Sequence, residues 1–119
     1  MGAQVTKPEY ADHPIRIEPD ARPRLVLVKD CVIANTTRGV MLFEASYPGV
    51  SYVPREDVNM TLLQRSPHKT HCPFKGEASY YSIATQDGLL ENAAWTYENP
   101  LPAAAGIASF LAFDPRCFD

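Results

Sequence analysis

Short apolar segments alternate with turn signals along the chain, and this pattern predicts β-strands. The run RLVLVK at 24–29 is followed by a tight turn and by a return segment at 31–34, which together predict a hairpin. Further strands are predicted at 38–44, 51–53, 78–85, 92–98 and 109–113. Turn signals recur about every 8–12 residues, which favours an all-β sandwich or barrel over repeated β-α-β units.

Four segments give weaker signals. Residues 54–57 suit a single helical turn, and residues 103–108 suit a short helix. Apolar and polar residues alternate at 58–62, which favours a strand, although a short helix fits as well. Pro67 and its polar neighbours predict a loop at 66–70.

The first 23 residues contain four prolines and little periodicity, so they predict an extended N-terminal arm. Within it, Ile15 and Ile17 alternate with polar residues, a pattern suited to docking on the body of the protein. We therefore expect one mostly-β domain at 24–119, with about seven or eight short antiparallel strands and one or two short helices. A chain of 119 residues is long enough to bury a core without covalent staples.

Composition and charge narrow the class of protein. Hydrophobic residues make up 45% of the chain and charged residues 21%, both typical of globular domains. A net charge of −3 argues against a nucleic-acid binder that relies on bulk positive charge. The sequence has no apolar run of about 20 residues and no secretory signal, so we expect a cytoplasmic protein without a membrane partner.

The cysteines and histidines do not predict a metal or a cofactor. Three widely spaced cysteines do not form a disulfide framework, which suits a reducing compartment. The sequence lacks a Cys-x-x-Cys pair, and its three histidines are scattered, so no metal site is expected.

The segment at 70–81 holds the densest set of reactive residue types. Cys72 is the candidate nucleophile, with His71 and Lys75 as nearby cations of the kind that lower a thiol pKa. The alternative is that Cys72 is a small buried apolar residue. Lys75 precedes Gly76, and a glycine lets the backbone approach an anionic ligand that the lysine holds. The alternative is a glycine turn with a solvated lysine.

Aromatic residues on the two predicted strands that follow are further candidates for a site near Cys72 and Lys75. Trp95 and Tyr97 share strand parity, and one of Tyr80 or Tyr81 should join them on that face. Such a cluster serves either as core or as the lining of a pocket, since tyrosine and tryptophan keep a polar group at one end.

A charged pair flanks the predicted strand at 38–44. Arg38 and Glu44 have the same parity, so both side chains are expected on one side of the sheet. The pair is either a solvated surface feature or, if it faces the inside of a barrel, part of a site.

Three motifs of this chain form a recognisable set. They are Tyr52-x-Pro54-x-x-Asp57-Val58, Thr70-x-Cys72-Pro73-Phe74-Lys75-Gly76-x-Ala78-x-Tyr80 and Ala94-Trp95-x-Tyr97-x-x-Pro100. The set resembles the family catalogued as domain of unknown function 427, over roughly residues 13–118. The resemblance implies a small, mostly-β domain whose function is largely unassigned, although the family has also been labelled a nucleotidyltransferase family. Such enzymes typically need a Gly-Ser motif followed by closely spaced metal-binding carboxylates that hold Mg²⁺, and the sequence lacks this combination.

Three functions stay open at this point. The leading one is binding of a small anionic or polar ligand in a pocket around the Cys-Pro-Phe-Lys-Gly segment, with or without weak enzymatic activity. The second is a non-catalytic interaction module or homodimer, and the third is nucleotide binding or nucleotidyl transfer. The predicted catalytic residues are Cys72 and Lys75. The predicted ligand-binding residues are Arg38, Glu44, Gly76, Tyr80, Trp95 and Tyr97.

Overall fold

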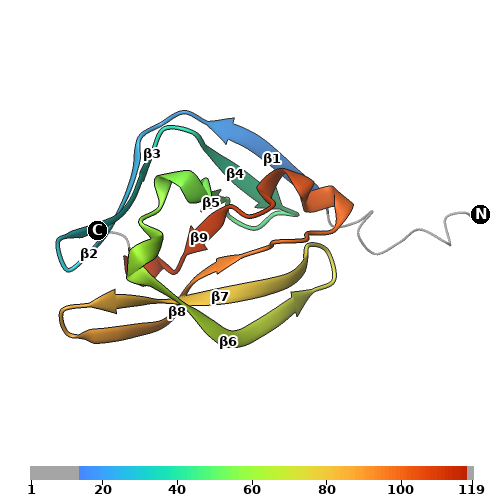
Figure 1. Ribbon diagram of the computed structural model, residues 1–119. Coiled ribbons are helices and arrows are strands. Elements are labelled where there is room, and N and C mark those ends of the chain that lie inside the picture. The colour runs from blue at the N-terminus through green and yellow to red at the C-terminus, as the bar shows by residue number, and fades with distance from the viewer. Residues whose placement is uncertain (1–13, 118–119) are drawn as a thin grey trace, which may run out of the picture.

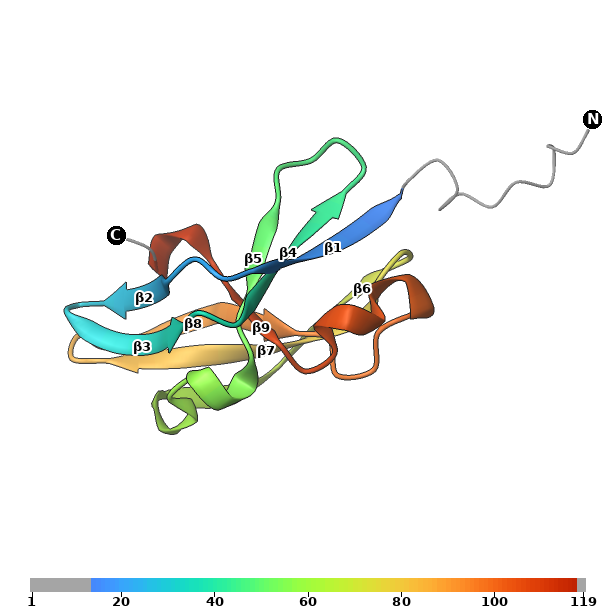
Figure 2. The ribbon, with the colours of Figure 1, turned by 90° about the horizontal axis from the view of Figure 1, so that it is seen from above.

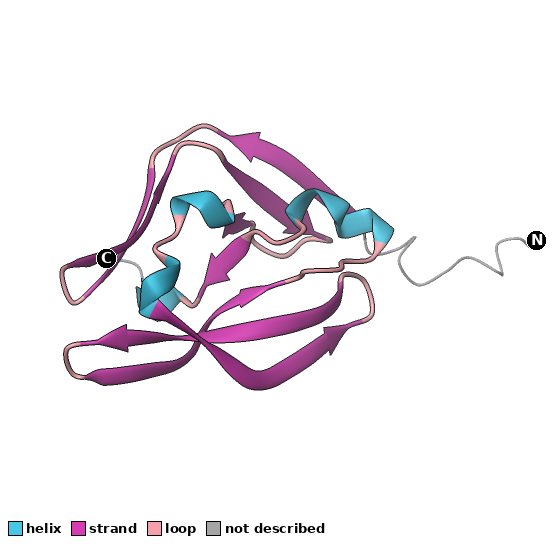
Figure 3. Ribbon diagram, in the orientation of Figure 1, coloured by secondary structure: helices cyan, strands magenta, loops and turns pink. Residues whose placement is uncertain are grey.

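The computed structural model describes residues 14–117, in which nine strands form three antiparallel sheets joined by turns and short 3-10 helices (Figures 1 and 3). The strands are β1 (Ile15–Asp20), β2 (Arg24–Val28), β3 (Cys31–Thr36), β4 (Gly39–Glu44), β5 (Val50–Tyr52), β6 (Leu63–Cys72), β7 (Gly76–Thr85), β8 (Gly88–Thr96) and β9 (Leu111–Phe113). The helices are η2 (Arg55–Asp57), η3 (Met60–Leu62), η4 (Pro102–Ile107) and η5 (Pro115–Cys117). The all-β prediction is confirmed, but no sheet within residues 14–117 closes into a barrel.

The three sheets have the strand orders β1-β4-β5, β2-β3 and β6-β7-β8-β9. Figure 1 shows the β1-β4-β5 sheet above the long β6, β7 and β8 strands, and Figure 2 shows the β2-β3 hairpin extending to one side. An isolated bridge between Val53 and Leu111 joins the chain just after β5 to β9. The first sheet is thereby connected to the four-stranded sheet.

The predicted hairpins form where the turn residues allow them. Lys29 and Asp30 have φ angles of 52° and 65°, and two successive residues of positive φ give the turn whose twist matches antiparallel strands. Gly88, at the start of β8, has a φ of 117° that favours glycine. Local turn chemistry therefore sets the β2-β3 and β7-β8 pairings.

Two sequence predictions were wrong. Residues 66–70, predicted as a loop, lie within β6. The register of β6 against β7 shifts between Arg65 and Lys69, and β6 is an edge strand, so Pro67 sits where no ladder hydrogen bond is lost. Residues 58–62, for which we favoured a strand, contribute only a single bridge from Val58 to Ala34, and Met60–Leu62 form the helix η3, whose first turn Asn59 caps by accepting a hydrogen bond from the Thr61 amide.

The segment at 15–20, which we assigned to the extended arm, is a strand of the domain. β1 pairs with β4 along its whole length, from Ile15 opposite Glu44 to Asp20 opposite Gly39. Ile15 and Ile17 pack against buried residues, as their alternation predicts. Residues 1–13 of the predicted arm lie outside the described part of the chain.

The buried residues form two clusters around the four-stranded sheet. The first lies between that sheet and the β2-β3 hairpin and includes Ile33, Ile83 and Leu111. The second lies between that sheet, the β1-β4-β5 sheet and η4, and includes Leu42 and Ile107. The candidate site lies at this second cluster.

Candidate functional site

The pairing of β7 with β8 brings three predicted aromatic residues to one face of the sheet. Tyr80 lies directly opposite Trp95 in the register, and their ring centres are 6.3 Å apart. Tyr97 belongs to the same buried cluster, whereas Tyr81 packs in the other cluster. Tyr80 is therefore the tyrosine that joins Trp95 and Tyr97.

Trp95 is anchored across the two sheets. Its Nε1 donates a hydrogen bond to the hydroxyl oxygen of Tyr52 at 3.3 Å. Tyr52 is buried, and burial raises the pKa of its hydroxyl despite the opposing effect of the indole hydrogen bond. Burial likewise raises the pKa of Tyr97. Both phenols stay neutral, so they act as fixed hydrogen-bonding groups and not as anions.

The lysine and glutamate that the sequence singled out lie together. Lys75, in the turn between β6 and β7, donates a hydrogen bond through Nζ to Glu44 at the end of β4. Their side chains are only 12% and 18% exposed. Lys75 Nζ also lies 5.7 Å from the centre of the Tyr97 ring. Burial lowers the pKa of Lys75, but the hydrogen bond from Lys75 to Glu44 and the electrostatic effects of neighbouring groups together outweigh it, so the pKa is raised and the ammonium stays charged.

Cys72 is adjacent to this ion pair. It is the last residue of β6, lies opposite Gly76 in the register, and packs half-buried against the second cluster. Cys72 also lies close enough to Lys75 to interact with it electrostatically. His71 is exposed, as expected for the neighbouring position of an extended strand. Gly76 has a φ of 107°, and it allows the tight return from β6 into β7.

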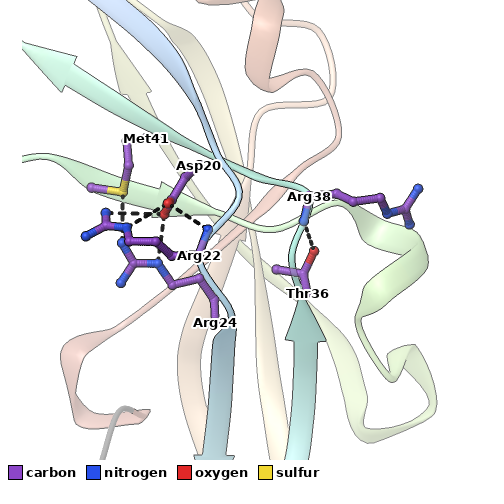
Figure 4. Close-up of polar contacts among 6 residues, drawn as sticks. All are labelled: Asp20, Arg22, Arg24, Thr36, Arg38 and Met41. Atoms are coloured by element: carbon purple, nitrogen blue, oxygen red, sulfur yellow. Dashed lines mark hydrogen bonds and ion pairs between the residues drawn. The ribbon is translucent and has the colours of Figure 1, made fainter.

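Arg38 is separate from the other predicted site residues. Its guanidinium pairs with Asp57 at 2.8 Å, and its side chain is 62% exposed. Its backbone N–H donates to the Thr36 hydroxyl at 2.9 Å (Figure 4). Arg38 thus connects the start of β4 to η2, whereas Glu44 meets Lys75 at the other end of the strand.

A cavity of about 550 Å³ lies beside Trp95, which is the one predicted site residue among those that line it. The walls come from β2, β4, β5, β8 and β9 and the residues beside them. They are Pro23, Arg24, Leu25, Met41, Gly49, Val50, Ser51, Trp95, Phe113 and Pro115.

A charged cluster lies at the corner between β1 and β2 (Figure 4), and its Arg24 lines this cavity. The buried carboxylate of Asp20 accepts from Arg22 Nε at 2.8 Å and from Arg24 Nε at 2.8 Å. Arg24 Nη2 also lies 3.7 Å from the sulfur of Met41. The hydrogen bonds from Arg22, aided by Arg24, hold the pKa of Asp20 well below its usual value although burial opposes them. Two guanidinium groups share one carboxylate, which leaves an excess of positive charge.

The sequence did not indicate this cluster. Arg24 stands at the start of an apolar strand and Asp20 in a proline-rich segment, positions where charged residues are ordinarily solvated. The signal that was present is the close spacing of three charged residues, Asp20, Arg22 and Arg24, just before the strand.

Two further features of the described residues bear on function. Between residues 14 and 117, no group of three or more His, Cys, Asp or Glu side chains is placed to hold a metal ion. In the same part of the chain, no helix has the length and apolar character needed to span a membrane.

The chain is thus a small antiparallel β domain in which an aromatic cluster and a largely buried lysine–glutamate pair join two sheets. Trp95 of the aromatic cluster also lines a cavity. The chain belongs to the family described as "Domain of unknown function (DUF427)", whose model matches residues 16–119. No curated protein matches the chain.

Proposed function

We propose that this domain binds a small molecule with an apolar, flat body and one anionic group in the cavity lined by Trp95. The observation that carries the proposal is the combination of apolar walls with a positively charged rim. Trp95, Phe113 and Met41 line the cavity, and Arg24 lines it as one of two guanidinium groups that share the single carboxylate of Asp20.

The size and the chemistry of the cavity suit such a ligand. A volume of about 550 Å³ lies within the range of pockets that enclose small molecules. A guanidinium has five N–H donors, and Asp20 accepts from only the Nε of Arg24. The remaining donors of Arg24 are suited to a carboxylate or sulfonate of the ligand.

Trp95 provides a rigid platform for the apolar body. Its indole is already held by the hydrogen bond to buried Tyr52. Trp95 therefore loses little conformational entropy when a ligand packs against it. Lys75 is assigned a different role from the one we expected. Because Glu44 neutralises it at a largely buried position, Lys75 orders the aromatic cluster behind Trp95 and leaves the anion to Arg24.

The proposal is testable with anilinonaphthalene sulfonate, a dye with an aromatic body and one anionic group. Trp95 is the only tryptophan of the chain, so energy transfer from the indole to the dye reports binding beside it. We expect saturable binding to the native protein, weakened about tenfold in Arg24→Gln, because a charge-assisted hydrogen bond is lost. Ser51→Leu should also weaken binding, because it places a larger side chain in the cavity.

The matched control is Arg16→Gln, which removes an exposed arginine of β1 that does not line the cavity. We expect dye affinity in this variant to equal that of the unmodified protein. Equal dye affinity in Arg24→Gln, Ser51→Leu and Arg16→Gln would overturn the proposal, as would a dye signal that appears only when the protein is partly unfolded.

A further inference from the structure

A second group of basic side chains lies on the face of the four-stranded sheet that carries Ser79 and Tyr81, opposite to the face of Tyr80 and Trp95. Arg65 and Lys69 come from β6, and their partners in the register are Tyr81 and Ser79 respectively. From this group we infer a second binding site, distinct from the Trp95 cavity, that takes the phosphate group of a small molecule or free phosphate.

Donors from three cationic side chains converge on two hydroxyl oxygens. Arg65 Nη2 and Lys69 Nζ donate to the Ser79 hydroxyl at 3.1 Å and 3.2 Å. Arg55 Nη1 and Arg65 Nη1 donate to the Tyr81 hydroxyl at 3.3 Å and 3.4 Å. Each hydroxyl accepts from two cations, so its own proton is available to an external acceptor. An oxyanion placed here meets cationic and hydroxyl donors at once.

The aromatic ring of Tyr81 keeps the two arginines in place. The guanidinium carbons of Arg55 and Arg65 lie 5.7 Å and 5.6 Å from its ring centre, within the range of cation–π attraction. Ser79 and Tyr81 are both buried, whereas the cationic side chains are largely exposed. The base of the group is therefore rigid, and its charged groups are accessible from solvent.

The charges of this group are not balanced by nearby carboxylates. Glu98 accepts from Arg65 through two hydrogen bonds of 2.9 Å and 3.0 Å. Lys69 lies 3.9 Å from the exposed Glu77, which is a weak pair in water. Arg55 forms no ion pair with any residue between 14 and 117. The pKa of Glu98 is lowered chiefly by Arg65, against burial, and further by Arg55 and Lys69, so three cations act on one carboxylate.

This donor set favours phosphate over a simple carboxylate. Arg65, Lys69 and Arg55 provide three separate cationic groups beside the Ser79 and Tyr81 hydroxyls, and a tetrahedral anion offers more oxygens to meet them than a planar one. Glu98 occupies the fork of Arg65 when no ligand is bound, so it acts as an internal competitor that the incoming anion must displace.

Calorimetric titrations with inorganic phosphate and with phenyl phosphate, at ionic strength held constant with sodium chloride, test the site. Arg55→Gln and Lys69→Gln should each weaken binding of both anions about tenfold, because each removes a charge-assisted hydrogen bond. Glu98→Gln should tighten binding, because it removes the competitor. Arg16→Gln, which removes an exposed arginine of β1, serves as the control and should leave affinity unchanged.

The three outcomes are separable. The site is supported if Glu98→Gln binds both anions more tightly and Lys69→Gln binds them more weakly than the unmodified protein. Tighter binding of phenyl phosphate than of inorganic phosphate identifies a phosphomonoester as the source of the phosphate. Equal weakening by Arg16→Gln would show a general charge effect and overturn the site. Absence of binding in both the unmodified protein and Glu98→Gln would overturn it as well. Lys69 is exposed, so Lys69→Gln is expected to fold, and a thermal unfolding curve checks this for each variant.

Discussion

Glu44 and Lys75 form a largely buried ion pair between the end of β4 and the β6-β7 turn. Breaking such a pair by removing one charge leaves the other charge without a partner in a poorly solvated place. We therefore expect Glu44→Gln to lower the free energy of unfolding by about 2 kcal/mol, measured by urea denaturation. Replacing both residues by methionine should cost less than Glu44→Gln alone, because no unpaired charge stays buried.

The control for this prediction is Glu18→Gln. Glu18 pairs with Arg16, and both side chains are at least half exposed, so the change should cost less than about 0.5 kcal/mol. An equally small effect of Glu44→Gln would mean that the Glu44–Lys75 pair is solvated.

Asp20 makes the free energy of unfolding depend on pH in the acidic range. The hydrogen bonds from Arg22 and Arg24 depress the pKa of Asp20 below the 3.8 of an ordinary aspartate, although burial opposes them. On acidification the unfolded chain takes up this proton first, so the stabilising contribution is complete above pH 3.8 and declines as the pH falls through the lower folded-state pKa. Asp20→Asn should thus be less stable than the unmodified protein at neutral pH, with the difference narrowing below about pH 4.

Urea midpoints measured across this pH range check the Asp20 prediction. Asp87→Asn is the matched control, because Asp87 is an exposed partner of Lys29 and its replacement should change stability little at any pH. A stability difference for Asp20→Asn that stays constant on acidification would contradict the prediction.

At the scale of the elements, local signals predicted most of the strands. The β2-β3 and β7-β8 hairpins depend on turn residues that adopt positive φ, and such residues are visible in the sequence at Lys29-Asp30 and Gly88. The β6 strand was missed because Pro67 and its polar neighbours read as a loop. Their place in the sheet depends on a bulge and on an edge position, which only the partner strand determines.

Gly76 offers a direct test of the β6-β7 turn. Its φ of 107° is strained for any residue with a side chain, so Gly76→Ala should destabilise the fold by about 1–2 kcal/mol in urea denaturation. A Cβ there would meet neighbouring backbone at 3.4 Å or more, which is ordinary contact, so strain and not crowding sets the cost.

Gly88→Ala separates the two causes. Gly88 has a φ of 117°, and a Cβ at this position would have no atom within 4 Å, so only strain applies. We expect similar costs at the two glycines. A much larger cost for Gly76→Ala would point to crowding against the chain at 99–101.

At the scale of the whole molecule, parity along a strand could be predicted from the sequence, whereas the packing of one sheet on another could not. Strand parity placed Trp95 and Tyr97 on one face with one of Tyr80 or Tyr81, and the register of β7 against β8 identifies this residue as Tyr80. The meeting of Lys75 with Glu44, 31 residues apart in the chain, depends on how two sheets pack, and parity within one strand does not encode this. The same holds for Arg24 of β2, which pairs with Asp20 of another sheet, and for Arg55 of η2, which meets Tyr81 of β7.

The three cysteines report on the whole fold, because they lie in different parts of it. Cys31 in β3 is exposed, Cys72 is half-buried beside the aromatic cluster, and Cys117 in η5 is buried. With an excess of a thiol reagent, we expect Cys31 to react first, Cys72 more slowly, and Cys117 only on unfolding in urea. Mass spectrometry of the labelled peptides, with Cys31→Ser to isolate the slower phases, gives the order.

The order of Cys31 and Cys72 also tests whether Cys72 at the β6-β7 turn is an activated nucleophile. If accessibility alone governs reaction, Cys31 stays faster than Cys72 at every pH, and Lys75 does not activate the Cys72 thiol. If Cys72 instead reacts faster than the more exposed Cys31 near neutral pH, and loses that advantage in Lys75→Met, then Lys75 stabilises a reactive thiolate. That result would make the β6-β7 turn a candidate nucleophilic site separate from the Trp95 cavity, since a half-buried thiol gains such reactivity from its neighbours and not from exposure.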